Sequence, residues 1–511
     1  MKKIVVLVIA LVLLLGVAPW GIGRMAEQRV NAGLDRFIEQ APYLSIVERQ
    51  WTSGWFRSEQ QVTFEVLGPW LEAMNRAAAR DDEDGEVDEE AYAQGDEDVE
   101  DADAASEDAE ADDADDSAAP IQPIRFSIRN EILHGPVLWP ASIGLVRINT
   151  RLVLSDEVRQ KLVDFLGTDE PVRMSTRVGF FGGGNTNFRG EGRTVTVKGE
   201  PGSFKYEDFE LDFGYSKNFD DIQIQGDWPG FEVSGSASGA SMQIRGLYVV
   251  GESERVLGEL YDGNVKFAVK EIRFVDAEES VSTVEDMRYE VGTEVEKGFF
   301  DVSARLGTGR IRNPALEQID LQLDEVHYDF TLRHLHAETL NALAKSFKGL
   351  YSRPVTTVED VDAAILEPFR EHGIALLEHD PALSIDRIGV VTPEGEAYLK
   401  GVIRLVGVTE EDLANNPMGM LAKLEADMTI EAPLRLIEKA PNGATTMGVA
   451  LDQGFARREG EKLVSRIVFK GGELKVNDKP VPLPGLGGGG PGMDDEDDGD
   501  YGYGEDDIGE E

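Results

Sequence analysis

The side chains best suited to proton transfer or nucleophilic chemistry are few, and a histidine beside a turn comes first among them. The chain has six histidines and no cysteine, so no thiolate can act as nucleophile or metal ligand. His134 precedes Gly135 and Pro136, which could hold a proton-transferring imidazole on a turn. No Ser, Asp or Glu motif nearby completes a triad, so a structural role is favoured. We expect the imidazole to cap the turn or to pack on Trp139.

A second group of histidines suggests a metal site. His327, His334 and His336 lie close together in the sequence. Two histidines at a spacing of two face the same way only on a strand, but His334 and His336 stand where a strand gives way to a helix. The neighbouring Asp329 and Glu338 are typical surface residues, and no HExxH pattern occurs. We therefore expect no metal site.

Three further patterns predict ordinary loops or surface. Residues 180–185 contain three glycines, but without a following Gly-Lys-Ser/Thr or helix they predict a hairpin turn, not a phosphate cradle. Five tail residues match the spacing of a calcium-binding loop: Asp494, Glu496, Asp498, Gly499 and Glu505. No helix is predicted on either side of them, so we expect a solvated acidic tail there. The 97 acidic residues guarantee chance carboxylate pairs, and no context selects two for glycoside hydrolysis. We expect no cofactor and assign no catalytic residue; whether the chain is an enzyme is left open, with a non-catalytic role favoured.

The charge is strongly acidic and unevenly spread. The net charge is −47, and residues 81–116 hold 21 acidic side chains with no Lys or Arg, while 494–511 hold 11 more. Such segments cannot bury enough apolar surface to order themselves, so 76–121 is expected to be a disordered insertion and 485–511 a disordered tail. The acidic balance also argues against nucleic acid as a partner, because phosphate binding requires a basic surface.

An apolar run at the N-terminus predicts a membrane anchor. It extends from Ile4 to Ile22 behind Lys2 and Lys3. Its length is close to the roughly 20 helical residues that cross a bilayer, and longer than the core of a cleaved signal peptide. Basic residues stand on both sides, so charge alone does not settle the orientation. The inner membrane is the expected partner, and the segment 25–38 is expected to continue as an amphipathic helix.

Between the acidic segments the dominant pattern has period two, which predicts half-buried strands. Such alternation is clear in five runs: 209–213, 222–225, 265–269, 319–323 and 326–332. Gly-containing breaks at 227–230 and 261–264 are expected to be turns, giving antiparallel meanders. Helical periodicity is confined mainly to 335–351, 358–378, 417–424 and 433–439, and the first pair could cover one face of a sheet.

These patterns predict an α+β fold that is predominantly antiparallel β, with long meandering sheets and a few covering helices after one transmembrane helix. We divide the chain as follows: 1–24 anchor, 25–75 stalk helix and first strands, 76–121 acidic insertion, 122–334 antiparallel β region, 335–484 helix pair and C-terminal β region, 485–511 Gly-rich acidic tail.

Several local motifs occur in a defined order: WTSGWFRS at 51–58, ILHGP at 132–136, DPALSI at 380–385, TPEGEA at 392–397 and FKGGELKVNDK at 469–479. Together they resemble the YdgA-like family, bacterial envelope proteins gathered under a domain of unknown function. The resemblance spans most of the chain outside the acidic segments, which depart from the family pattern. It implies an inner-membrane anchor, a periplasmic body and, for some members, a link to motility. It implies no activity. The motif residues of unknown role are Gly54, Phe56, Ser58, His134, Gly135, Pro136, Asp380, Pro381 and Gly395.

Three functions from different classes are compatible with the sequence, in this order of preference. The first is a non-catalytic envelope scaffold or assembly factor, acting as a homodimer or with a membrane partner. The second is a carrier of lipids or other amphiphiles, which requires a continuous apolar concavity that the helices leave uncovered. The third is a hydrolase of envelope polymers, which requires clustered acids or His134 in a deep cleft.

Overall fold

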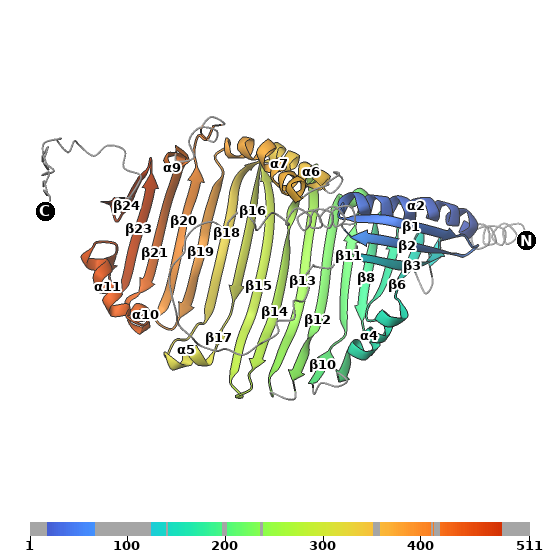
Figure 1. Cartoon of the computed structure of the whole chain (residues 1–511), viewed down its shortest axis with the longest axis horizontal. Helices are drawn as coiled ribbons and strands as arrows, with labels where there is room; N and C mark the ends of the chain where they lie inside the picture. Colours follow the sequence, from blue (N-terminus) through green and yellow to red (C-terminus); the bar gives the residue numbers. More distant parts are fainter. Residues whose placement is uncertain are drawn as a thin grey trace, which may run out of the picture.

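One antiparallel sheet makes up most of the molecule (Figure 1). The structure is a computed structural model that describes residues 18–66, 124–138, 142–196, 202–235, 239–350, 358–409, 412 and 419–482. The predicted anchor residues 4–17, the insertion 76–121 and the tail 485–511 lie outside these described residues. Within the described part of the chain, no helix is both long and apolar enough to span a membrane.

Within the described residues the sheet contains 23 strands, and all their pairings are antiparallel. In chain order they are β1 (Leu44–Thr52), β2 (Arg57–Val66), β3 (Ile124–His134), β6 (Val146–Val153), β7 (Arg173–Val178), β8 (Gly184–Gly190), β9 (Arg193–Thr196), β10 (Gly202–Tyr206), β11 (Phe209–Tyr215), β12 (Asp221–Gly235), β13 (Ser241–Leu257), β14 (Leu260–Val275), β15 (Val281–Glu296), β16 (Phe299–Thr308), β17 (Ile311–Arg312), β18 (Glu325–His336), β19 (Ala382–Thr392), β20 (Gly395–Leu405), β21 (Leu424–Pro433), β22 (Arg457–Glu459), β23 (Lys462–Lys470), β24 (Glu473–Val476) and β25 (Lys479–Val481). Strands β4 (Val137–Leu138) and β5 (Ser142–Ile143) form a separate pair. Most strands pair with their neighbours in the chain, so the predicted antiparallel meander is confirmed.

Helices lie mainly at the ends of the strands (Figure 1). They are α2 (Ala18–Gln40), α4 (Asp156–Leu166), the short 3₁₀ helix η3 (Lys217–Phe219), α5 (Pro314–Gln318), α6 (Ala337–Leu350), α7 (Val358–Leu377), α9 (Gly419–Lys423), α10 (Leu434–Lys439) and α11 (Gly443–Asp452). Helices α6 and α7 pack together at one edge, where α6 contacts β13, β14 and β18. They therefore close the ends of strands and do not cover the middle of a sheet face.

Three local predictions were wrong. Residues 319–323 do not form a strand: they follow α5, and Asp320 has a left-handed backbone with φ of 52°. Residues 227–230 are no turn, because β12 runs through them, pairing first with β11 and then with β10. Residues 261–264 lie within β14, and the actual turn comes earlier, at Gly258. In each case a glycine or a short alternation is locally ambiguous, and pairing with neighbouring strands decides the structure.

Register keeps the apolar side chains of successive strands on the same face. We call the face that carries Leu211, Phe267 and Leu399 the inner face, and the opposite one the outer face. On the inner face, Leu211 lies opposite Phe188, and Phe267 lies between Val249 and Tyr289. Because side chains alternate with period two, these pairings place whole apolar rows on one side.

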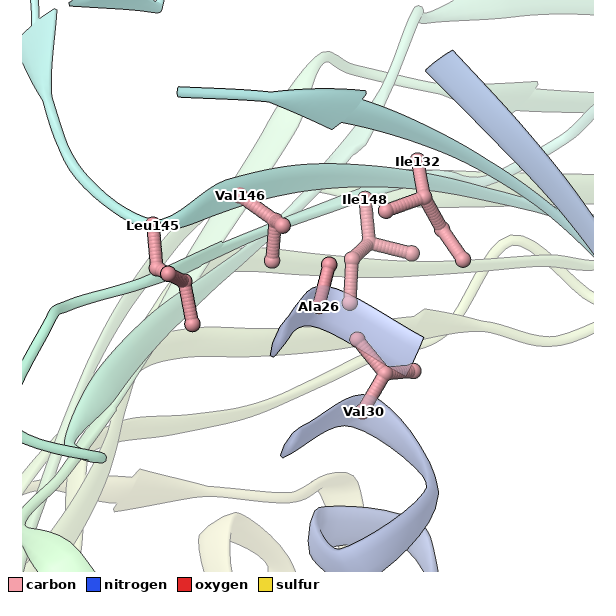
Figure 2. Close-up of a cluster of buried hydrophobic side chains, with 6 residues drawn as sticks. All are labelled: Ala26, Val30, Ile132, Leu145, Val146 and Ile148. Atoms are coloured by element: carbon pink, nitrogen blue, oxygen red, sulfur yellow. The ribbon is translucent and has the colours of Figure 1, made fainter. Parts of the chain in front are cut away.

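A small apolar core joins helix α2 to the inner face of the sheet (Figure 2). Ala26 and Val30 of the helix contact Ile132, Val146 and Ile148 of strands β3 and β6, and all are buried. The helix residues stand four apart, so they share one side of α2. Burial of this apolar stripe fixes which side of the helix faces the sheet.

A ladder of buried amides also holds α2 on the sheet. Gln60 of β2 donates to Asn31 of α2 at 2.8 Å, and Asn130 of β3 donates to Gln60 at 2.9 Å. Thr150 of β6 completes the chain by donating to Asn130 at 2.7 Å. Because buried polar groups must find partners, each of these bonds restricts the position of the helix along the strands.

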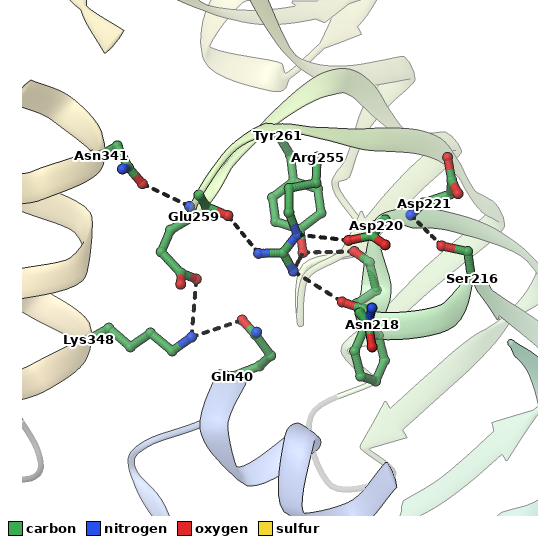
Figure 3. A network of polar contacts seen from close by, with 12 residues as sticks. Gln40, Ser216, Asn218, Asp220, Asp221, Arg255, Glu259, Tyr261, Asn341 and Lys348 are labelled. Carbon is green, nitrogen blue, oxygen red and sulfur yellow. Dashed lines mark hydrogen bonds and ion pairs between the residues drawn. The ribbon is translucent and has the colours of Figure 1, made fainter. Parts of the chain in front are cut away.

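The C-terminal end of α2 is tied to the helix pair (Figure 3). Lys348 of α6 donates to Gln40 at 3.3 Å and pairs with Glu259 at 3.1 Å. Asn341, also on α6, accepts from the backbone of Glu259 at 2.9 Å. A side chain at Gly258 would meet Asn341 at 2.2 Å, so the β13–β14 turn and α6 fit only with glycine there.

The α2 core gives a matched test of stability on one strand. Ile132 is fully buried, whereas Ile124 of the same strand is 64% exposed. We expect Ile132→Ala to lower the free energy of unfolding by about 2–5 kcal/mol, because it removes buried methyl groups and leaves a cavity. Ile124→Ala should change it by less than about 0.5 kcal/mol. Denaturant titration measures both, and equal effects would contradict the packing of α2 on β3.

Candidate binding cavity

The N-terminal motif residues come together at the start of α2. His134 lies at the end of β3, 76 positions from Ser58 of β2, and the His134 Nε2 and Ser58 Oγ atoms are 3.0 Å apart. The His134 Nδ1–H donates to the carbonyl of Trp55 at 3.2 Å, which leaves Nε2 to accept from the Ser58 hydroxyl. The serine beside His134 thus comes from another strand, and among the described residues no Asp or Glu bonds the imidazole to complete a triad. Its suggested partner Trp139 is outside the described residues.

This serine–histidine pair is closed off from solvent. Ser58 is 2% exposed and His134 is 6% exposed. Helix α2 covers the imidazole, since a Cβ on Gly23 would lie 2.6 Å from His134 Cε1. A nucleophile must reach its substrate, so in this arrangement the pair fastens α2 to the end of the sheet.

The other N-terminal motif residues shape the same end of the molecule. A Cβ at Gly54 would lie 2.2 Å from the Arg57 carbonyl, and one at Gly135 would lie 1.9 Å from the Gly144 carbonyl. Both positions thus require glycine for close backbone approach. Gly135 and Pro136 are joined by a cis peptide. Phe56 and its neighbour Trp55 are exposed, 59% and 52%.

The C-terminal motif residues are far away and have backbone roles. Asp380 has a left-handed backbone, and its carboxylate accepts from Gly407 N at 2.6 Å. Pro381 accepts from Leu405 N, so both help to pin the start of β19 beside the end of β20. Gly395 turns the β19–β20 hairpin with φ of 126°. These residues do not join the Ser58–His134 pair.

Three histidines gather near Asp380, but as stacked rings. His334 stacks on Phe299 with centroids 3.7 Å apart, and His336 stacks on His379 at 4.1 Å. The Nδ1 atoms of His334 and His379 each donate to a backbone carbonyl. Among the described residues, no three His, Asp or Glu side chains are arranged to hold a metal ion. His327 lies apart and contacts Glu325 at 2.9 Å.

An apolar cavity lies between α2 and the inner face of the sheet. Its volume is about 560 Å³, within the range of about 300–1,000 Å³ typical of ligand pockets. The helix contributes Val30, Leu34 and Phe37 to its walls. The sheet contributes a floor of aromatic and aliphatic side chains from five strands: Phe64, Phe126, Phe188, Leu211 and Phe213 with Ile224.

The lining of the cavity also includes polar side chains. The amide ladder through Gln60 and Asn130 forms part of one wall, and these amides already have partners. Tyr215 closes another part and stacks on Phe219 with centroids 5.0 Å apart. Burial raises the pKa of the Tyr215 hydroxyl, so the ring stays neutral. The cavity lining is therefore mostly apolar, with Arg29 and Arg36 of α2 among its polar members.

Basic side chains stand at the rim of this cavity, beside the turn between β7 and β8. A Cβ at Gly182 would lie 3.3 Å from Lys217 Cγ and 3.7 Å from Arg29 Nη1, so both side chains approach this turn. Both are exposed. Within the described ranges, neither has an ion-pair or hydrogen-bond partner. Phe181, next to them, is 92% exposed.

A second large hollow, on the outer face, is polar. Its volume is about 820 Å³, and it is lined by arginines and carboxylates that pair with one another. Arg173 bonds Glu191 at 2.6 Å, and Arg189 bonds Glu210. Hydrogen bonds from Arg189 and Asn187 lower the pKa of Glu210. A general acid needs a raised pKa, so this carboxylate is unsuited to that role.

The sequence motifs include Ser58 and His134, and the carrier hypothesis requires an apolar concavity, but the sequence does not locate the cavity. Neither Arg29 nor Lys217 belongs to one of the sequence motifs described above. The available signal was the strand alternation, which predicts an apolar face but not which part of it a helix leaves open.

The contact of Gly23 with His134 gives a second matched test. Gly23→Val places methyl groups against the imidazole, so α2 must lift; overpacking of this kind costs about 1–3 kcal/mol. Gly21→Val is the control, because no atom lies within 4 Å of a Cβ there. Thermal unfolding and limited proteolysis of α2 measure the effect. Equal stability of the two variants would contradict the close packing of α2 on His134.

Comparison with known proteins gives one match. A family model described as bacterial protein of unknown function (DUF945) matches residues 1–484. No curated protein and no solved structure matches the chain.

Proposed function

The chain belongs to this bacterial family, DUF945, and on that premise we propose that it binds an anionic lipid between α2 and the inner face of its sheet. In this proposal the acyl chain occupies the apolar cavity and the headgroup lies at the basic rim. The site sits beside the inner membrane, in which residues 4–22 anchor the protein, and the body is periplasmic. We also propose that the chain is YdgA-like within the family, on the motifs described above.

The observation that carries the proposal is the apolar cavity itself. A helix and a sheet normally exclude water by close packing, with few voids larger than a water molecule. Here the buried apolar contacts of α2 with the sheet centre on Ala26 and Val30, and about 560 Å³ beside that core is open. The open volume is lined mostly by aromatic and aliphatic side chains, which favour an apolar ligand.

The basic side chains at the rim indicate that the lipid headgroup carries a negative charge. The protein carries a net charge of −47, so exposed cations have many carboxylates available as partners. Arg29 and Lys217 nevertheless approach one turn at the rim of the cavity, and no contact to a carboxylate occupies either among the described residues. Two such cations favour a phosphate or carboxylate headgroup over a neutral one.

The position of the cavity supports delivery from a membrane. Helix α2 continues directly from the predicted anchor. Near its N-terminal end, Trp55 and Phe56 are more than half exposed, and aromatic side chains are typical of the bilayer interface. This arrangement would place the cavity within one helix length of the membrane surface.

The other two functions receive less support. A hydrolase needs an accessible nucleophile or a carboxylic acid with a raised pKa, whereas Ser58 is 2% exposed and the Glu210 pKa is lowered. A scaffold or a homodimer does not account for an apolar cavity that has a basic rim. Lipid binding explains both features, so it moves ahead of the scaffold role that the sequence favoured.

The test uses the full chain, extracted from bacterial membranes in a mild detergent and studied by native mass spectrometry with lipid extraction. We expect bound phospholipid in a defined ratio, enriched in anionic species. Gly33 lines the cavity, and no atom lies within 4 Å of a Cβ there. Gly33→Phe should therefore fill the cavity without a clash and reduce bound lipid about tenfold, corresponding to about 1.4 kcal/mol of binding.

Two controls make the outcome specific. Gly21→Phe adds the same side chain to the same helix, also with no atom within 4 Å, but Gly21 is not part of the cavity lining. It should retain lipid. Arg29→Glu combined with Lys217→Glu should remove the preference for anionic lipid while neutral lipid still binds. A wild-type protein free of lipid, or equal lipid on both glycine variants, would overturn the proposal.

A further inference from the structure

The apolar floor of the cavity does not end where α2 ends. One row of directly paired residues crosses the inner face strand by strand and continues beyond the cavity. From β11 to β23 it runs Leu211, Gly226, Val249, Phe267, Tyr289, Leu306, Tyr328, Ile388, Leu399, Ile430 and Ser465. Every member but the glycine and the terminal serine is aliphatic or aromatic, so the row is a continuous apolar path.

This path is exposed in the middle of the sheet. Phe267 is 37% exposed, Tyr289 43%, Tyr328 46% and Ile430 40%. Side chains in a closed core are buried below one tenth, as Ile132 is in the core under α2. Contiguous exposed apolar surface of this kind marks a site of interaction.

The outer face has the opposite character. Strand neighbours there form ion pairs across the same strands, such as Lys266 with Glu290 at 3.4 Å and Arg387 with Glu396 at 2.8 Å. Further along, Arg466 pairs with Asp427 at 2.7 Å. The outer face is thus a solvated surface, and the apolar character of the inner face is not a general property of this sheet.

We propose that the exposed inner face of β12–β21 is a track for the acyl chains of the anionic lipid, continuous with the α2 cavity. This inference rests on the proposed function and extends it from binding to movement along the sheet. Nine strand spacings of about 4.8 Å separate β11 from β21, so the path is roughly 43 Å long. One lipid leaflet is about 15 Å thick, so an acyl chain occupies only part of the path and has room to move along it.

Continuity and charge favour lipid over a second copy of the chain as the occupant. The row starts at Leu211, which is itself part of the cavity floor, so the path and the cavity share one surface. A second copy would bring another net charge of −47 against the first. Like charges oppose such face-to-face association, whereas an acyl chain brings no charge onto the sheet.

The test places a photoreactive side chain at matched tyrosines of the full chain. Tyr289 and Tyr328 of the inner face are 43% and 46% exposed, and Tyr248 of the outer face is 45% exposed. Tyr215 lies in the cavity. Each is replaced in turn, as in Tyr289→p-benzoylphenylalanine. The protein is then reconstituted in vesicles of phosphatidylglycerol and phosphatidylethanolamine and irradiated, and cross-linked lipid is measured by mass spectrometry.

We expect strong lipid cross-linking at positions 215, 289 and 328 and only background at 248. Cross-linking at 215 alone would overturn the track and leave lipid binding in the cavity intact. Absence of cross-linking at all four positions would overturn the proposed function as well. Equal labelling at 248, or chain-to-chain cross-links at 289 and 328, would also overturn the track, the second by showing that a partner copy covers the face.

Two matched substitutions, each of which introduces one charge, test whether lipid follows the inner face. Val265 of the inner face is 39% exposed, and Val250 of the outer face, on the adjacent strand, is 43% exposed. With the probe at Tyr328, Val265→Glu should reduce lipid cross-linking to background while cross-linking at 215 persists. Val250→Glu should change neither. A loss of labelling with both variants, or with neither, would contradict a path along the inner face.

Discussion

Alternation of side chains across the antiparallel register is the constraint on which the rest of this structure depends. A slip of one residue at any strand would exchange its apolar and polar faces. Where the sequence breaks the alternation, a bulge restores it. Between β16 and β18 the register shifts so that Leu332 and Leu335, three positions apart, lie opposite Val302 and Phe300. His334 takes a left-handed backbone within that bulge. The apolar row of the inner face thereby continues across the bulge.

Helix α2 converts one end of this face into a cavity. Its position is set by apolar contacts of Ala26 and Val30 and by the amide ladder from Asn31 to Thr150. Apolar packing alone tolerates sliding, but a buried amide without its partner costs about 1–3 kcal/mol, so the ladder fixes the register. A helix held at defined points leaves space between them. The cavity results from the way in which α2 is attached to the sheet. In the proposed function, the basic side chains at its rim favour an anionic headgroup.

The buried Ser58–His134 pair shows how chemistry-bearing residues can serve architecture. Their geometry resembles a catalytic pair, with Nδ1 donating to a carbonyl and Nε2 accepting from a hydroxyl. Yet Gly23 of α2 seals the imidazole from solvent, and no charged group completes the arrangement among the described residues. The same atoms therefore hold the helix that forms the roof of the cavity. The proposed function therefore depends on an apolar surface and not on a reacting group.

The sequence by itself determined the antiparallel strands, the helices at α2, α6 and α10, and the acidic balance, because these depend on local periodicity and composition. It misplaced 319–323 and the breaks at 227–230 and 261–264, where local preference is weak. Only the tertiary structure brought Ser58 to His134 and Arg29 to Lys217, since each pair joins strands or helices far apart in the chain. It also decided which part of the apolar face is covered, because that depends on where α2 docks and not on any one strand.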